Sequence, residues 1–105
     1  MIKAKGKIKT QEFVDHLGSL LPLAHTNLID GFKENQRELL KKSLDDANSL
    51  IENNEWGIGL ENLLTNLYEI EFNIDNKTVK LAFDALKSCG FKLEEWKFIE
   101  ELKSK

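Results

Sequence analysis

One continuous segment, residues 55–72, constrains the fold more than any other part of the chain. Its apolar side chains recur at steps of three and four residues, which places them along one side of an α-helix. They are Trp56, Leu60, Leu63, Leu64, Leu67 and Tyr68. The opposite side carries polar groups, namely Glu61, Asn62, Thr65, Asn66 and Glu69. The pattern predicts a central helix that buries its apolar side in the core.

The same segment lies in a part of the chain that has no basic residue. Between Lys42 and Lys77 there are eight acidic residues and neither Lys nor Arg. The whole chain has a formal net charge of only −3, so its negative charge is concentrated here. The acids are Asp45, Asp46, Glu52, Glu55, Glu61, Glu69, Glu71 and Asp75. Because surfaces normally mix both signs of charge, this segment predicts either a solvated helical face or a surface that binds a basic partner.

Length and composition limit the possible folds. A chain of 105 residues forms one domain with a modest core. Its single Pro and six Gly leave little material for the many turns of an all-β fold. We therefore predict an all-α fold, a compact bundle of about five short helices. No apolar run is long enough to span a membrane and the start of the chain is not a secretory signal, so we expect a cytoplasmic protein.

The first nine residues are basic. Residues 1–9 contain four lysines and no acid, and we predict a flexible or extended N-terminal arm followed by one helical domain over residues 10–105. A basic arm is able to bind nucleic acid. This one has no aromatic side chain to stack on bases, and the chain as a whole is acidic, which argues against that role.

Start and stop signals divide residues 10–105 into helices. Thr10 is the expected N-cap of the first helix, and Pro22 ends that helix near Leu21. Asp75 is the expected N-cap of a later helix, which Gly90 is placed to end. The other helices follow from their apolar spacing. The expected ranges are 10–21, 23–30, 32–52, the central segment, 76–88 and about 92–102.

Catalytic chemistry is not indicated. His16 and His25 have no spacing that zinc motifs use, so we interpret both as surface or partly buried residues. Cys89, the only cysteine, is placed near a helix C-terminus that disfavours a thiolate, which suggests a small buried residue. The Gly57-Ile58-Gly59 sequence lacks the Lys of a phosphate-binding loop. We predict no enzymatic activity, no cofactor and no metal site.

Three aromatic residues admit two interpretations. Trp56 and Trp96 occupy helix-periodic positions, and core packing is the preferred interpretation of both because aromatic residues dominate core energetics. Trp and Tyr are also enriched at protein interfaces. Trp56 or Tyr68 is therefore an alternative candidate for an interface anchor.

Residues 55–63, followed by Asn66-Leu67-Tyr68-Glu69, resemble the central motif of the MafI-like immunity proteins. The downstream pattern is similar as well, with an acid-rich turn, a helix, Gly90 and a short helix that contains Glu95-Trp96 and Phe98. The resemblance covers residues 39–102 and extends to the CdiI-type immunity proteins of contact-dependent growth inhibition. It implies a small helical antidote that binds the C-terminal domain of a toxin, often a nuclease, in the cytoplasm of the producing cell.

The resemblance and the charge pattern together predict a function. A nuclease needs a basic groove for its nucleic acid, and an inhibitor that presents carboxylates to that groove blocks it. The predicted partner is thus a basic cognate toxin domain, bound by a monomer that contacts neither nucleic acid nor membrane. The predicted partner-binding residues are Glu55, Glu61, Asn62, Asn66, Glu69, Glu71 and Asp75.

Two other classes remain open from the sequence. A small antitoxin or phage-type regulator would bind nucleic acid through the N-terminal lysines, against the acidic balance of the chain. A small enzyme would need a ligand-bound histidine pair or a polar pocket, and the sequence indicates neither.

Overall fold

Four α-helices make up most of the chain. The structure is a computed structural model that describes residues 2–29, 31 and 33–103, with side chains from Lys5 onward. The elements in chain order are α1 (Ile2–Ser19), the 3₁₀ turn η1 (Leu21–Leu23), α2 (Gln36–Glu52), α3 (Trp56–Glu69), α4 (Asn76–Ser88) and the 3₁₀ helix η2 (Leu93–Leu102). The described residues contain no strand, only two isolated bridges. The prediction of an all-α bundle of about five short helices is confirmed.

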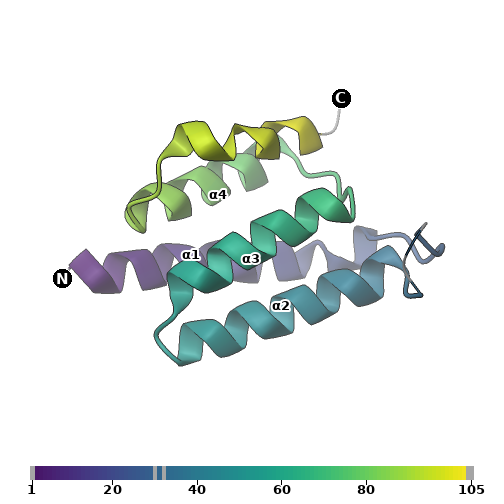
Figure 1. Ribbon diagram of the computed structural model, residues 1–105, viewed down its shortest axis with the longest axis horizontal. Coiled ribbons are helices and arrows are strands. Elements are labelled where there is room, and N and C mark those ends of the chain that lie inside the picture. Colours follow the sequence, from purple (N-terminus) through teal and green to yellow (C-terminus); the bar gives the residue numbers. More distant parts are fainter. Residues whose placement is uncertain (1, 30, 32, 104–105) are drawn as a thin grey trace.

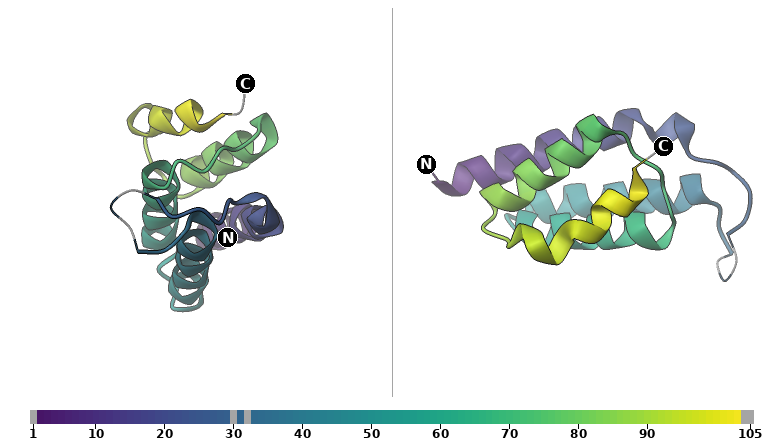
Figure 2. Two further views of the ribbon diagram at one scale, coloured as in Figure 1. Left: turned by 90° about the vertical axis from the view of Figure 1, so that its right-hand side faces the viewer. Right: turned by 90° about the horizontal axis from the view of Figure 1, so that it is seen from above.

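The helices form two antiparallel pairs (Figure 1). In the first pair, α2 and α3, Asn66 donates a hydrogen bond to Ser43 and the backbone at Gly59 lies against Ala47. In the second pair α1 lies on α4, with the start of α1 beside the end of α4. Figure 2 shows η2 along one edge of the bundle, where it packs on α4 and α3.

The core is built around the predicted central helix. Leu60, Leu63, Leu64 and Leu67 are at most 1% exposed, and they join buried side chains of α1, α2, α4 and η2 in one core cluster. Representative partners are Phe13, Leu40, Leu86 and Ile99. The predicted core packing of Trp56 and Trp96 is only partial, since both are partly buried at the margin of the core, and Tyr68 is 40% exposed.

The predicted N-terminal arm is wrong in its described part, because α1 begins at Ile2. Gly6 is buried, and a Cβ there would lie 2.9 Å from Trp56 Nε1 and 3.2 Å from the carbonyl oxygen of Ser88. The missing side chain thus lets α1 dock closely on the end of α4. Thr10 is not an N-cap: it is fully buried in mid-helix, with its hydroxyl 3.4 Å from Cys89 Sγ.

The connection between α1 and α2 also differs from the prediction. In place of a short helix over residues 23–30, the chain makes the η1 turn at Pro22 and continues without regular structure, while Asp30 lies outside the described residues. The Arg37 guanidinium donates to the carbonyl oxygens of Pro22 and Ala24 and so holds this path in place. Helix α2 begins at Gln36 rather than near Phe32, which is also outside the described residues, because Asn35 is its N-cap.

The later start and stop signals are confirmed. Asp75 is the N-cap of α4 and accepts a hydrogen bond from the backbone N–H of Thr78. Gly90 has a φ of 85°, the left-handed conformation in which glycine ends helices. The apolar residues of the last helix recur at steps of three, which is the period of a 3₁₀ helix, and η2 has that form with Ile99 and Leu102 buried.

Candidate functional site

The outward side of α3 is the main candidate for a binding surface. It consists of Ile58, Glu61, Asn62, Thr65, Tyr68 and Glu69, and we call it the α3 face. Two large apolar side chains are unusually accessible here, since Ile58 is 50% and Tyr68 40% exposed. They lie among carboxylate, amide and hydroxyl groups and no base. Such a mixture of apolar and acidic groups is able to contact a basic protein.

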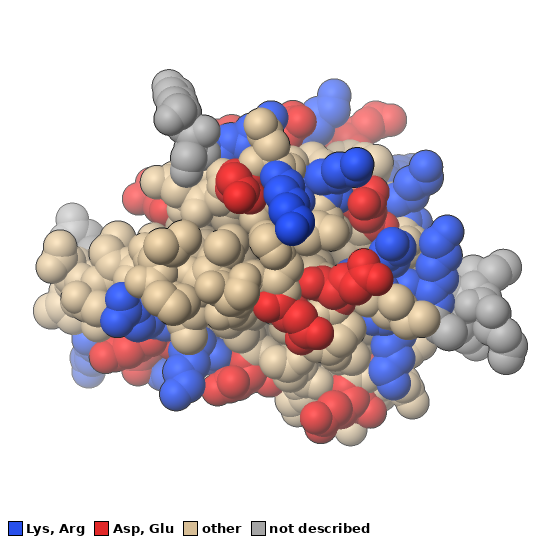
Figure 3. Space-filling model, turned by 180° about the vertical axis from the view of Figure 1, so that it is seen from behind, with Lys and Arg blue, Asp and Glu red and all other residues tan. Residues whose placement is uncertain are grey.

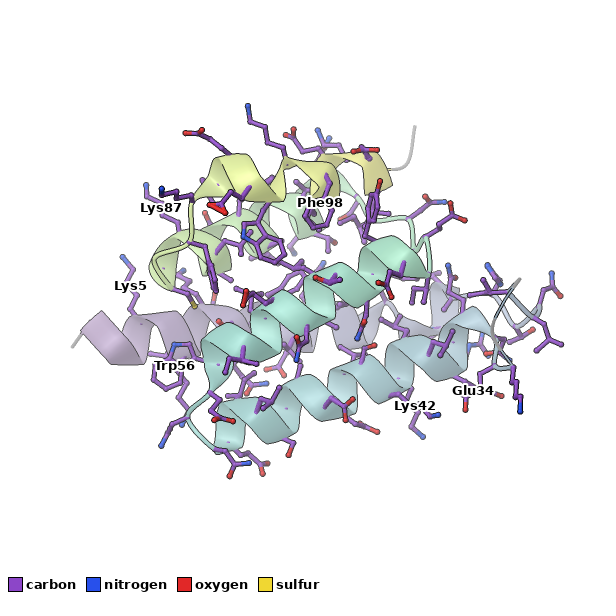
Figure 4. The ribbon with its side chains drawn as sticks, in the orientation of Figure 1. Lys5, Glu34, Lys42, Trp56, Lys87 and Phe98 are labelled. Atoms are coloured by element: carbon purple, nitrogen blue, oxygen red, sulfur yellow. The ribbon has the colours of Figure 1, made fainter. Side chains whose placement is uncertain are left out.

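Tyr68 is held in one orientation by η2. Its ring packs edge-on against Phe98 with the centroids 5.0 Å apart, and its hydroxyl lies 3.4 Å from Glu101 Oε1. In Figure 4 the Phe98 side chain lies between η2 and α3. A small hollow of about 240 Å³ beside Tyr68 is lined by Glu71 and Glu101. Glu101 therefore extends the acidic surface, although it lies far outside the acidic segment of the sequence.

Helix α2 borders the other side of the α3 face. A hollow of about 200 Å³ between the helices is lined by Asp46, Asn66, Glu69 and Lys42, among others. Lys42 directly precedes the acidic segment, and its ammonium group donates to Glu34 at 2.6 Å. Asn66 donates to Ser43 at 3.1 Å, so this predicted partner-binding amide also ties α3 to α2.

The structure does not gather all seven predicted site residues. Glu61, Asn62 and Glu69 share the α3 face, and Glu71 is exposed just beyond the end of α3 with a φ of 53°. Glu55 is exposed at the opposite end of this 14-residue helix, about 20 Å from Glu69 by the helical rise. Asp75 lies at the N-terminus of α4, with His16 of α1 nearby. The compact group is therefore Glu61, Asn62, Glu69 and Glu71, extended by Tyr68 and Glu101.

Asp75 belongs to a chain of hydrogen bonds between α1 and α4. The Thr78 hydroxyl donates to Asp75 Oδ1, and His16 Nε2 lies 3.0 Å from the same hydroxyl oxygen. Because the Thr78 hydrogen is used on Asp75, the hydrogen of the second bond comes from His16. The hydroxyl and the backbone N–H of Thr78 hold the pKa of Asp75 below its ordinary value, and the nearby His16 lowers it further. Thr78 is fully buried, so these hydrogen bonds join α1 to α4 and leave no accessible nucleophile.

A cavity of about 620 Å³ lies between the α1–α2 connection and the segment after α3. Its rim includes Leu23 and Leu28, which are 75% and 71% exposed, and the exposed His25. Gln36 crosses its base: the side chain accepts from His25 N and donates to the carbonyl oxygen of Ile70. Glu71 lines this cavity as well as the hollow beside Tyr68, so an acid separates the apolar rim from the α3 face.

Cys89 is partly buried where α1 meets α4. Its Sγ contacts the Thr10 hydroxyl and lies 3.8 Å from the carbonyl oxygen of Gly6. The predicted role of a small packed residue agrees with this position, apart from its incomplete burial.

Within residues 2–29, 31 and 33–103, no three His, Cys, Asp or Glu side chains are grouped so as to hold a metal ion. None of the described helices combines the length and the apolar character needed to cross a membrane. No protein-family model, curated protein or solved structure matches this chain.

Proposed function

We propose that this protein is an immunity protein that binds and neutralises the C-terminal domain of a polymorphic or contact-dependent growth inhibition toxin. The observation that carries the proposal is the α3 face, where exposed Ile58 and Tyr68 lie among acids in a segment without a base. The resemblance of residues 39–102 to MafI-like immunity proteins supports the same function. A nuclease is the toxin class that fits this face best, because its nucleic-acid groove is basic.

Tyr68 supplies the apolar centre of the proposed contact. Tyr is enriched among the few residues that dominate binding energy at interfaces. The edge-on contact with Phe98 orients the ring before binding, so little side-chain entropy remains to be lost when a partner covers it. Glu61, Glu69, Glu71 and Glu101 surround this centre and would attract Lys and Arg side chains of the toxin.

Charge reversal on the α3 face tests the proposal. The probe is the C-terminal domain of the cognate toxin, and the measurement is surface-based binding kinetics at two ionic strengths. Carboxylates at the rim of an interface govern the association rate, so the variant Glu61→Lys with Glu69→Lys should associate more slowly. The wild-type association rate should fall as salt shortens the Debye length to about 3 Å near 1 M.

A matched variant separates the α3 face from overall charge. Asp45→Lys with Glu52→Lys changes the net charge equally, at exposed positions of α2 that do not line the hollow between the helices. This control should retain most of the association rate. Tyr68→Ala should weaken binding by about 2 kcal/mol or more, mainly through faster dissociation. If the α3-face reversal and the control behave alike, the toxin binds elsewhere.

A further inference from the structure

A second charged surface, opposite in sign, lies where the start of α1 meets the end of α4. A hollow of about 510 Å³ is lined by Lys5, Lys9, Asp84, Lys87 and Ser88, and we call it the lysine hollow. Figure 4 shows Lys5 and Lys87 at the same end of the bundle, on separate helices. In Figure 3 basic side chains gather at that end of the rear face. Lys5 and Lys9 thus share one basic site with Lys87, which lies 78 or more positions away in the sequence.

Because residues 2–9 are helical, Lys5, Lys7 and Lys9 do not all lie on the same side of α1. Lys5 and Lys9 are one turn apart and lie on the side of α1 that borders α4. Lys7 lies on another side and donates to Asn54 Oδ1 at 3.2 Å. Buried Gly6 docks this turn of α1 on α4, so the backbone that carries Lys5 and Lys9 is held beside Lys87. A site of fixed geometry thus replaces an extended arm.

The charges around the hollow leave a basic excess. Residues 43–76 contribute −8 and the whole chain is −3, so the remaining residues together carry +5. Lys9 lies 3.6 Å from Glu12, an exposed pair of little strength. In the described part of the chain, Lys5, Lys87 and Asp84 form no ion pair. The start of α1 and the end of α4 lie side by side, so their opposite dipole charges offset each other.

The chemistry of the lining identifies the class of ligand. All five lining residues are charged or polar, so the hollow offers no apolar anchor of the kind that protein partners use. No aromatic side chain lines it, so it has no platform on which a base could stack. Three ammonium groups and a hydroxyl are donors that suit phosphate oxygens. We propose that the lysine hollow binds phosphate groups, carried by a polyphosphate or by a nucleic-acid backbone, without reading base sequence.

Binding of two probes to the full chain tests this proposal. The probes are sodium pyrophosphate and a single-stranded DNA 12-mer of mixed sequence, followed by fluorescence anisotropy and by amide chemical shifts. The shifts should concentrate at residues 5–9 and 84–88. With three lysines engaged, the slope of log K against log salt for the 12-mer should be about −2, a fall of roughly twentyfold between 50 and 200 mM.

Two triple variants locate the effect. Lys5→Gln, Lys9→Gln and Lys87→Gln together should bring the slope close to zero, since each phosphate contact removed lowers it by about 0.7–1. Lys33→Gln, Lys41→Gln and Lys97→Gln remove the same charge from exposed positions outside the hollow and should preserve the slope. Thermal unfolding should show both variants folded, because none of the six side chains is buried.

The remaining outcomes are equally informative. Competition of pyrophosphate with the 12-mer supports a site for isolated phosphate groups, and binding of the 12-mer alone supports a backbone site. Equal losses in the two triple variants, the absence of binding by either probe, or equal binding of a 12-residue polyglutamate peptide would overturn the proposal. None of these results bears on the α3 face, since the two surfaces share no residue.

Discussion

The α2–α3 pair and the α1–α4 pair are both antiparallel helix pairs, but they differ in how far apart their two helices lie in the sequence. A turn of three residues joins α2 to α3, and their contact between Asn66 and Ser43 spans 23 residues. The contact between Thr10 and Cys89, which joins α1 to α4, spans 79 residues. Closing the longer loop costs more conformational entropy, so specific side-chain fit has to hold the second pair. The charge differs as well: the first pair presents the acidic α3 face and the second the lysine hollow.

Each pair contains one glycine where the two helices approach closely. A Cβ at Gly59 would lie 3.3 Å from the carbonyl oxygen of Ala47 and from Leu50 Cβ. At Gly6 the closest α4 atom is the Ser88 carbonyl oxygen, 3.2 Å from the added Cβ, and Trp56 Nε1 of α3 lies closer, at 2.9 Å. Both pairs therefore approach closely at a glycine, and at Gly6 the start of α1 also meets α3.

The largest expected effect tests whether the two pairs share one core. Phe13 of α1 and Leu63 of α3 are at most 1% exposed. Phe13→Ala should cost about 3–5 kcal/mol and Leu63→Ala about 2–5, because each leaves a cavity. Both should move a single urea transition, followed by circular dichroism and by tryptophan fluorescence. Ile58→Ala, at an exposed position, should stay within about 0.5 kcal/mol. Separate transitions for the two probes would mean that the helix pairs unfold independently.

Two glycines of α1 should respond with opposite signs. Gly6→Ala should destabilise the protein by about 1–3 kcal/mol, since the added methyl group meets Trp56 and the backbone of Ser88. Gly18→Ala meets nothing within 4 Å and should stabilise the protein by about 0.5 kcal/mol through lower backbone entropy in the unfolded chain. Chemical denaturation measures both. A stabilising Gly6→Ala would mean that the N-terminal turn of α1 does not dock on α4.

The smallest expected effect concerns the N-caps of α2 and α4, one helix from each pair. Asp75 of α4 and Asn35 of α2 each accept a backbone hydrogen bond at 2.9 Å. Replacing either by Ala should cost about 1 kcal/mol near neutral pH. The two costs should diverge in acid, as measured by denaturation at several pH values.

The sign of this divergence follows from the lowered pKa of Asp75. Its stabilisation is fully present above the ordinary value of 3.8 that applies to the unfolded chain, and it is lost as the pH falls through the lower folded value. The Asn35 amide does not titrate, so the cost of Asn35→Ala should stay constant through this range. An equally constant cost for Asp75→Ala would show that the hydrogen bonds from Thr78 do not favour the carboxylate.

The α3 face shows which of its residues could be predicted from sequence patterns and which could not. Glu61, Asn62 and Glu69 were predicted together because helical spacing puts them on one side of α3, and they share the α3 face. Glu55 and Asp75 were included because they lie in the acidic segment, yet the structure puts them at the far end of α3 and in a helix cap. Glu101 was missed because only the packing of η2 on α3 brings it to Tyr68. Nothing in the local sequence signals that contact.

Local rules determined the helices and their ends. The apolar spacing of α3, the caps at Asp75 and Gly90, and the three-residue period of η2 depend on neighbouring residues alone, so they could be predicted from the sequence. Tertiary packing decided what residues 2–9 become. Four lysines and no acid are typical of a solvated arm. In the structure, however, Gly6 and Thr10 contact the end of α4, and no local sequence pattern connects these two residues with that helix. The sign of each surface likewise depends on which distant side chains the fold brings together, because charge adds up in space and not along the chain.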